Sequence, residues 1–241
     1  MFGRTVRPLV EAGRRLPRSY GGWRVPVQVF AGLAAALALA VVLTGGAEAA
    51  DRPVRIVALG DSLTAGLGLP VNAAFPAKLE QALKAKGMAV EITNAGVSGD
   101  TASAGLARLD WSVPEGTDAV IVELGANDTL RGIDPKVTRQ ALEEIVRRLR
   151  GRGIAVLLAG MRAAPNLGPD YARDFEAIYS DLAARNDLLL YPFFLDGVAT
   201  DAKLNQHDGL HPTAAGVDAI VARILPKAEE LVARAREKRG M

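Results

Sequence analysis

Short, continuous apolar runs alternate with helix-like segments along most of this chain. The runs are RIVALG at 55–60, MAVEITNAG at 88–96, DAVIVELGAND at 118–128, IAVLLAG at 154–160 and LLLYPFF at 188–194. Strands that are apolar on both faces are typical of a parallel sheet covered by helices on both sides. The pattern therefore predicts an α/β fold, a three-layer α/β/α sandwich around a central, mostly parallel five-stranded sheet.

The segments between these runs have apolar residues at helical spacing, and helices are expected at 75–87, 101–109, 134–153 and 171–186. A last helix is expected after Pro212, extending toward Arg236. The helix at 134–153 has the clearest boundaries, because Asp134 suits an N-cap and Pro135 a first turn. Right-handed crossovers bring the carboxyl ends of the strands to one edge of the sheet, as in flavodoxin-like folds. Ligands bind at this edge, so chemistry is expected in the segments that follow the strands.

Residues 1–50 differ from the rest of the chain in charge. They hold six arginines and two glutamates, whereas the whole chain has 29 basic and 27 acidic residues. Residues 51–241 are therefore slightly acidic, and they contain no basic stripe of the kind that marks a nucleic-acid surface. We expect no nucleic-acid partner.

The same 50 residues indicate export. An uncharged apolar run, FAGLAAALALAVVL at 30–43, follows the arginines, and the small residues Ala47 and Ala49 come after it. This order is typical of a signal peptide with its cleavage site. An uncleaved anchor is the alternative, since 25–44 is close to the length that crosses a bilayer. Cleavage is favoured, which predicts a periplasmic or secreted body; an uncleaved leader would hold it at the inner membrane.

The chain contains no cysteine. This excludes disulfides, Cys-ligated zinc, iron–sulfur sites and a thiol nucleophile. Reactive residues are therefore expected among hydroxyl, imidazole, carboxyl and amide side chains.

Four short motifs stand where strands end or in the late loops: Gly60-Asp61-Ser62-Leu63, Gly96-Val97-Ser98-Gly99-Asp100, Gly125-Ala126-Asn127-Asp128 and Asp208-Gly209-Leu210-His211-Pro212. Together they resemble the motifs of the SGNH branch of the GDSL hydrolases, and most of all its thioesterase I-like, arylesterase and lysophospholipase type. The resemblance covers nearly all of 54–236, with the motifs in the family's order. It implies an SGNH hydrolase domain at 51–241, and a serine ester hydrolase that needs no metal or organic cofactor.

The chemistry of ester hydrolysis fits these residues. A serine hydroxyl is a poor nucleophile until a base takes its proton, and Ser62 follows a buried strand where its Oγ can be exposed. His211 is the expected base, because Asp208 can hold one ring nitrogen while the other faces Ser62. His207 has no such partner and is expected to be a loop residue. The alternatives are that Ser62 only caps the next helical turn and Asp208 the last helix.

Attack on a carbonyl places negative charge on its oxygen, which hydrogen-bond donors must stabilise. The expected donors of this oxyanion hole are the backbone N–H groups of Ser62 and Gly99 and the side-chain amide of Asn127. Gly99 lacks a Cβ, so a substrate can approach its amide. The resemblance gives glycine and asparagine at these motif positions the same role. Alternatively, Gly99 is only a turn residue and Asn127 only a strand-end cap.

The nature of the substrate is indicated more weakly. The loops at 67–69, 129–133 and 160–168 are expected at the same sheet edge and are largely apolar. Leu130, Arg131, Arg162 and Pro165 are the expected substrate-binding residues, and the resemblance implies that 129–133 covers an acyl groove. Lipid-like or aryl esters are therefore the favoured small-molecule substrates, and contact with a membrane surface is a further expectation. Ordinary loop packing is the alternative.

Two other functions remain open on such a fold. A polysaccharide O-deacetylase would use the same residues but would need an open, polar cleft. A non-catalytic binding domain would be expected to lack at least one of Ser62, Asn127, Asp208 and His211, and all four are present. A nucleotide-binding domain is not indicated, because no G-x-G-x-x-G or G-K-[ST] loop follows the first strand. Whether the protein is a monomer or a dimer is left undetermined.

Overall fold

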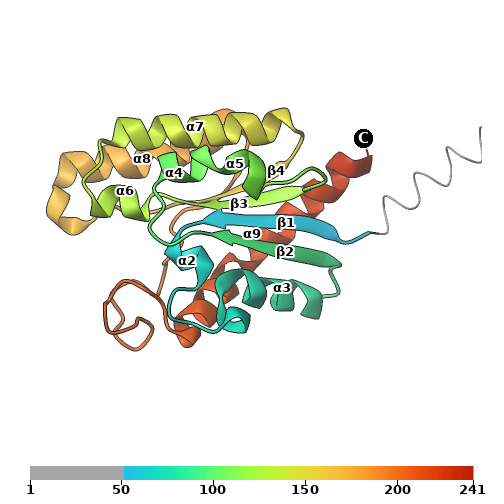
Figure 1. Cartoon of the computed structure of the whole chain (residues 1–241), viewed down its shortest axis with the longest axis horizontal. Coiled ribbons are helices and arrows are strands. Elements are labelled where there is room, and N and C mark those ends of the chain that lie inside the picture. The colour runs from blue at the N-terminus through green and yellow to red at the C-terminus, as the bar shows by residue number, and fades with distance from the viewer. Residues whose placement is uncertain (1–51, 241) are drawn as a thin grey trace, which may run out of the picture. The chain divides into compact units, whose positions relative to one another are not determined.

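The five apolar runs form one parallel sheet in the computed structural model, which describes residues 52–240 (Figure 1). The strands are β1 (Val54–Gly60), β2 (Val90–Gly96), β3 (Ala119–Glu123), β4 (Ala155–Ala159) and β5 (Leu189–Tyr191). Their order is β2-β1-β3-β4-β5, and every neighbouring pair is parallel. This is the flavodoxin-like order, in which the strand sequence reverses beside β1 and β3. The predicted fold class is confirmed.

Helices cover both faces of this sheet (Figure 1). On one face α3 (Phe75–Ala85) packs against β2, and α9 (Ala214–Gly240) packs against β4 and β5. The other face carries α4 (Ala102–Ala107), α5 (Leu109–Ser112), α7 (Pro135–Gly151) and α8 (Pro169–Asn186). Asp134 caps α7 and Pro135 lies in its first turn, as predicted. The two covered faces explain why the strands are apolar throughout.

The core lies between the sheet and the two helix layers. All residues of β3 and β4 are buried, and so are all residues of β1 except Arg55. β2 leaves several side chains at the surface because it is an edge strand. Phe75 and Phe194 meet edge-on with 4.9 Å between ring centroids, which joins α3 to the segment after β5. This packing holds the carboxyl ends of the strands, and the loops that leave them, in one arrangement.

Two strands are much shorter than the sequence pattern predicted, whereas β2 and β4 differ from their predicted runs by only two residues each. The run at 118–128 ends as a strand at Glu123, and helix α6 (Ala126–Leu130) begins directly after Gly125. Gly125 has a φ of 119°, and a Cβ there would collide with the hydroxyl of Tyr179. Only glycine permits this turn, which places the Asn-Asp pair of the third motif in a helix. The run at 188–194 keeps only β5 as a strand, and the chain continues in turns to residue 200.

The helix predicted at 101–109 breaks at Arg108, which separates α4 from α5. The buried Arg108 guanidinium donates to Asp100 Oδ2 at 2.6 Å, to Ser112 Oγ at 2.9 Å and to the Gly60 carbonyl at 2.9 Å. A buried guanidinium requires such partners. The contact ties the loop after β2 to the end of β1.

The opposite, amino edge of the sheet is held by ion pairs around Asp118. Arg52 donates to both carboxylate oxygens of Asp118 at 2.9 and 2.8 Å, and Arg239 from the last turn of α9 pairs with the same group. Burial alone would raise the pKa of Asp118, but the hydrogen bonds from Arg239 and Arg52 lower it to about 2. This cluster joins the start of the described chain to its last helix.

The predicted signal peptide or anchor at 1–50 lies outside the described residues. Between residues 52 and 240, no helix has both the length and the apolar character needed to cross a membrane.

Candidate active site

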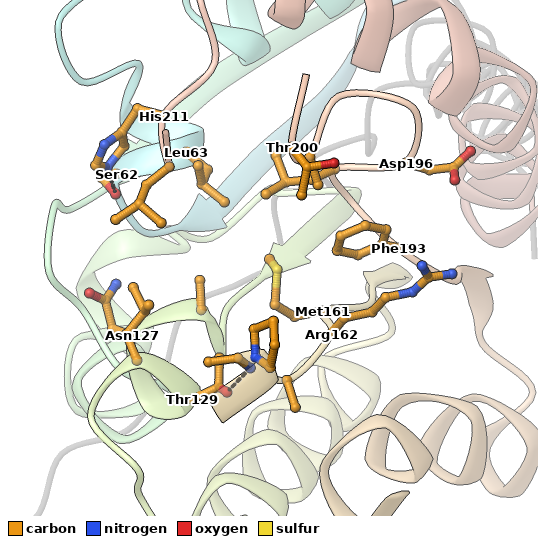
Figure 2. Close-up of a pocket in the computed structure, with 18 of the residues that line it drawn as sticks. Ser62, Leu63, Asn127, Thr129, Met161, Arg162, Phe193, Asp196, Thr200 and His211 are labelled. Carbon is orange, nitrogen blue, oxygen red and sulfur yellow. Dashed lines mark hydrogen bonds between the residues drawn. The ribbon is translucent and has the colours of Figure 1, made fainter. Parts of the chain in front are cut away.

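Two loops at the carboxyl edge of the sheet bring the first and fourth motifs together. β1 ends at Gly60, and the short helix α2 (Ser62–Ala65) begins two residues later. Asp61 caps α2 by accepting a hydrogen bond from the Leu63 amide at 3.0 Å, so the Ser62 hydroxyl is not used as the cap. Ser62 Oγ instead lies 2.8 Å from His211 Nε2, although 149 residues separate the two (Figure 2).

The other nitrogen of the His211 ring is held by Asp208. His211 Nδ1 lies 2.6 Å from Asp208 Oδ2, and Asp208 Oδ1 accepts hydrogen bonds from the amides of His211 and Leu210 at 3.0 and 2.9 Å. These two amides and the His211 ring hold the pKa of Asp208 well below its usual range. The Gly216 amide at the start of α9 donates to Thr213, so Asp208 does not serve as the cap of that helix. A short local loop therefore fixes the ring so that Nε2 faces Ser62.

Two backbone N–H groups that the sequence predicted as oxyanion donors have no hydrogen-bond acceptor among residues 52–240. They belong to Ser62 and Gly99. Gly99 has a φ of 89°, a conformation that favours glycine, and its carbonyl accepts a hydrogen bond from Arg131 at 2.7 Å. The Arg131 guanidinium therefore joins the loop after α6 to the loop after β2. Both N–H groups remain free to donate to a ligand.

Asn127 lies beside the same site, but its amide is already engaged (Figure 2). Asn127 Nδ2 donates to Asp61 Oδ2 at 3.1 Å and to the Asp100 carbonyl at 3.0 Å. An amide nitrogen carries only two hydrogens, so both are used in this arrangement. Asn127 can donate to a substrate only if it gives up or shares one of these bonds.

Two buried carboxyl groups stand beneath the Ser62 turn, at the end of β3 and at the cap of α2. Glu123 Oε2 accepts hydrogen bonds from Thr64 Oγ1 at 2.8 Å and from the Asp61 amide at 3.4 Å, whereas Glu123 Oε1 has no partner within residues 52–240. Neither Asp61 nor Glu123 forms an ion pair with a cation in this part of the chain. Burial raises the pKa of Glu123 well above its usual value and raises the pKa of Asp61 to about 6. The sequence analysis missed Glu123, although a glutamate in a fully apolar strand was a visible signal.

A cavity of about 710 Å³ opens beside Ser62 and His211. Figure 2 shows Ser62 and His211 at one end, Arg162 and Asp196 at the other, and Leu63, Met161 and Phe193 between them. The Arg162 guanidinium lies over the Phe193 ring, 4.6 Å from its centroid. The Asn127 amide lies beside Ser62, the wall beyond it is largely apolar, and the charged side chains Arg162 and Asp196 lie at the far end.

The predicted substrate-binding residues separate into two groups. Leu130, Arg162 and Pro165 line the cavity, whereas Arg131 turns to the Gly99 carbonyl and does not. The loop at 67–69 is not part of the lining either. The turns at 193–200 supply a wall that the sequence analysis missed, because the apolar run at 188–194 was assigned to a strand.

Clusters suited to a metal ion are absent from residues 52–240, where no three His, Asp or Glu side chains converge for that purpose.

Comparisons with known proteins agree with the four motifs. Residues 58–219, which include all four, match the GDSL-like lipase/acylhydrolase family. The esterase TesA of Pseudomonas aeruginosa is 37% identical over 195 residues, covering 80% of this chain and 96% of that protein. The thioesterase 1/protease 1/lysophospholipase L1 of Escherichia coli K12 is 40% identical over 173 residues, covering 71% of this chain and 80% of that protein.

A solved structure shares the fold. The crystal structure of AlinE4, an SGNH-hydrolase family esterase, is 47% identical and superposes with a TM-score of 0.63. The match covers 74% of this chain and 96% of AlinE4. The resemblance seen in the motifs is confirmed.

Proposed function

Because this chain belongs to the GDSL-like lipase/acylhydrolase family, and its relatives above are named esterases and thioesterases, we propose that it hydrolyses esters with Ser62, His211 and Asp208 as its catalytic residues. The observation that carries the proposal is the continuous chain of contacts from Ser62 Oγ to His211 Nε2 at 2.8 Å and from His211 Nδ1 to Asp208 at 2.6 Å. A hydroxyl, a base and a group that orients the base are the parts that acyl transfer requires.

The proposed reaction has two halves. Ser62 Oγ attacks the carbonyl carbon of the ester while its proton passes to His211 Nε2, and His211 then gives that proton to the departing alcohol. The product of this half is an acyl-enzyme on Ser62. In the second half a water loses its proton to His211 and attacks the acyl carbon, and the carboxylic acid leaves as Ser62 regains its proton. Asp208 stabilises the imidazolium that forms in both halves.

The developing oxyanion is proposed to lie between the N–H groups of Ser62 and Gly99. Both are unpartnered among the described residues, so they can donate without any rearrangement. Arg131 supports this geometry by holding the Gly99 carbonyl. Preformed donors of this kind stabilise the transition state because no reorganisation is needed when the charge appears.

Asn127 is proposed as the third donor, with one exchange. When the oxyanion forms, the Asn127 N–H that donates to the Asp100 carbonyl donates to the substrate oxygen instead. The other N–H keeps its hydrogen bond to Asp61 Oδ2. A charged acceptor attracts the hydrogen more strongly than a neutral carbonyl does. Asp61 is thereby a positioning residue for Asn127.

Lipid-like or aryl esters are the proposed substrates. The cavity begins at Ser62 and continues along Leu63, Met161 and Phe193, which suits an acyl chain or an aryl ring. Leu130, Arg162 and Pro165 are proposed as further substrate-binding residues, and Arg131 as a support of Gly99. The relative named thioesterase 1/protease 1/lysophospholipase L1 supports the lipid ester as one class.

The two alternative functions are less well supported. A polysaccharide O-deacetylase would be favoured by a polar cleft, and the wall that continues from Ser62 is largely apolar. A non-catalytic binding domain would not need the contacts that join Ser62, His211 and Asp208. No metal or organic cofactor has a part in the proposed reaction.

Export is proposed from the leader at 1–50 alone. The periplasm or the medium is the proposed location if the leader is cleaved, and the inner membrane if it is retained. N-terminal sequencing of the mature protein decides between these, because cleavage after Ala49 would give an N-terminus at Ala50.

Covalent labelling tests the catalytic proposal. A fluorophosphonate should label one site per chain, at Ser62, and Ser62→Ala should remove the label. Labelling at another residue, or wild-type activity in His211→Ala, would contradict the triad. A panel of esters of rising acyl length, run beside acetylated xylan, tests the substrate; preference for the acetylated polysaccharide would favour the deacetylase.

A further inference from the structure

Within residues 52–240, most of the exposed large apolar side chains lie on segments at the carboxyl edge of the sheet. Seven large apolar side chains are exposed within residues 52–240. Five of them lie on segments that leave the carboxyl ends of β1, β2, β3 and β5, and we call these five the apolar rim: Leu67, Val71, Val97, Leu130 and Leu210. The other two, Trp111 and Val137, lie on α5 and α7.

Contacts tie the rim to the reactive residues. Leu130 and Leu210 line the cavity and are also exposed, so they stand at its opening. Leu67 lies against the loop that carries His211, because Gln206 Nε2 donates to the Leu67 carbonyl at 2.8 Å. Val97 follows β2 directly and its amide donates to the Gly60 carbonyl at 3.0 Å, two residues before Ser62. Through Leu130 and Leu210, the rim therefore continues the apolar wall of the cavity outward to solvent.

Three charged groups among these loops are held by neighbouring residues. The carboxylate of Asp208 is engaged by His211, and that of Asp100 by Arg108. Arg131, which follows Leu130, donates to the Gly99 carbonyl rather than to an acid.

Aliphatic side chains left in water cost free energy unless something covers them, and clustered ones mark interaction surfaces. We propose that the apolar rim docks the protein on the surface of a phospholipid aggregate, so that an acyl chain passes from lipid to cavity without crossing water. This inference rests on the proposed lipid ester substrate. The continuity of rim and cavity selects lipid over a second protein copy, because a copy seated on the rim would close the opening that the substrate must use.

Vesicle binding by catalytically silent protein tests the docking. The body from Arg52 onward encloses its own core, and AlinE4 is matched over 96% of its length by 74% of this chain, so the body can be studied without the apolar leader. In a Ser62→Ala background, which leaves the lipid intact, co-sedimentation is measured with vesicles of phosphatidylcholine containing phosphatidylglycerol. The rim variant is Leu67→Ser with Val71→Ser.

The matched control is Trp111→Ser with Val137→Ser. Its side chains are 75% and 44% exposed, against 86% for Val71 and 46% for Leu67 in the rim pair. Both double variants replace two exposed apolar side chains with serine, one pair on the rim and the other on α5 and α7. Near-identical circular dichroism melts exclude unfolding as a cause.

We expect the rim pair to weaken partitioning by about tenfold and the control pair to leave it unchanged. Equal partitioning of the two pairs would overturn the inference, and so would absence of vesicle binding by the parent. Binding that disappears in 0.5 M salt would also overturn it, since apolar docking persists when charges are screened. A dimer that only the rim variant dissociates in sedimentation velocity would assign the rim to a second copy. Fluorophosphonate labelling of each pair with Ser62 restored reports separately on the proposed function.

Discussion

A buried carboxyl group lies at each end of β3, and the pKa values of the two groups are shifted in opposite directions. Asp118 precedes the strand and is bonded to Arg52, Arg239 and the Arg55 amide, which bring its pKa to about 2. Glu123 is the last residue of the same strand, and burial without a cation raises its pKa well above the usual value. At the amino edge, the charged groups pair with one another and stabilise the fold. The carboxyl edge keeps polar groups that are unpartnered within residues 52–240, such as Glu123 Oε1 and the Gly99 N–H, where the substrate is proposed to react.

The largest difference between the two edges, in their effects on activity and on stability, is expected from removing the proposed nucleophile. Ser62→Ala should lower kcat by at least about 10⁴-fold. It should leave the unfolding free energy within about 0.5 kcal/mol of wild type, because within residues 52–240 the hydroxyl forms a hydrogen bond only with His211. Activity is measured on a soluble aryl ester and stability by urea unfolding. A large loss of stability would show that this edge is built for folding as well.

A smaller loss is expected from the third donor. Asn127→Ala should lower kcat by about 10²- to 10³-fold with little change in KM, since the bond to the oxyanion forms only in the transition state. Asn94→Ala is the matched control at the same edge, because its side chain bonds only the Ala65 carbonyl and the Gly96 amide. Equal losses of kcat in the two variants would mean that Asn127 only supports the local structure.

The amino edge should show the reverse pattern. Asp118→Ala leaves Arg52 and Arg239 without their shared acceptor and should lower the unfolding free energy by about 2 kcal/mol, with kcat unchanged. Asp110→Ala serves as control, since its exposed carboxylate meets Arg148 only at 3.4 Å and exposed pairs contribute little. A fall in kcat for Asp118→Ala would mean that the two edges are coupled.

The smallest expected effect is the dependence of the unfolding free energy on pH. The folded-state pKa of Glu123 and of Asp61 is raised, so the native state binds more protons than the unfolded state, and stability should rise as pH falls from about 7 to about 5. The pKa of Asp118 is lowered, so its contribution is present above about pH 4 and is lost as pH falls toward 2. Stability should therefore be greatest near pH 5.

Glu123→Gln isolates the first of these contributions. Urea unfolding at pH 7 and pH 5 should show a smaller rise in stability in Glu123→Gln than in wild type, because the glutamine cannot take up a proton. The fall below pH 4 should remain in both proteins. An unchanged rise would mean that Glu123 titrates alike in the folded and unfolded states.

Much of the fold could be predicted because its signals are local. Continuous apolar runs, helical spacing, and the Asp134-Pro135 pair each act within a few residues, and the structure places strands and helices near them. The Asp208 and His211 contact also spans only three residues. The element ends were predicted less well, because Gly125 and Arg108 are positioned by Tyr179 and the Gly60 carbonyl, which are distant in sequence.

By itself, the sequence determined the sheet, the edge that carries the motifs, and the residue types available for acyl transfer. Tertiary structure alone decided that both Asn127 hydrogens are engaged, that the 193–200 turns wall the cavity, and that Arg131 supports Gly99 instead of lining it. The physical reason is range: periodicity and capping act between neighbours along the chain. A hydrogen bond between residues 61 and 127, by contrast, exists only once the packed core has set where each loop begins.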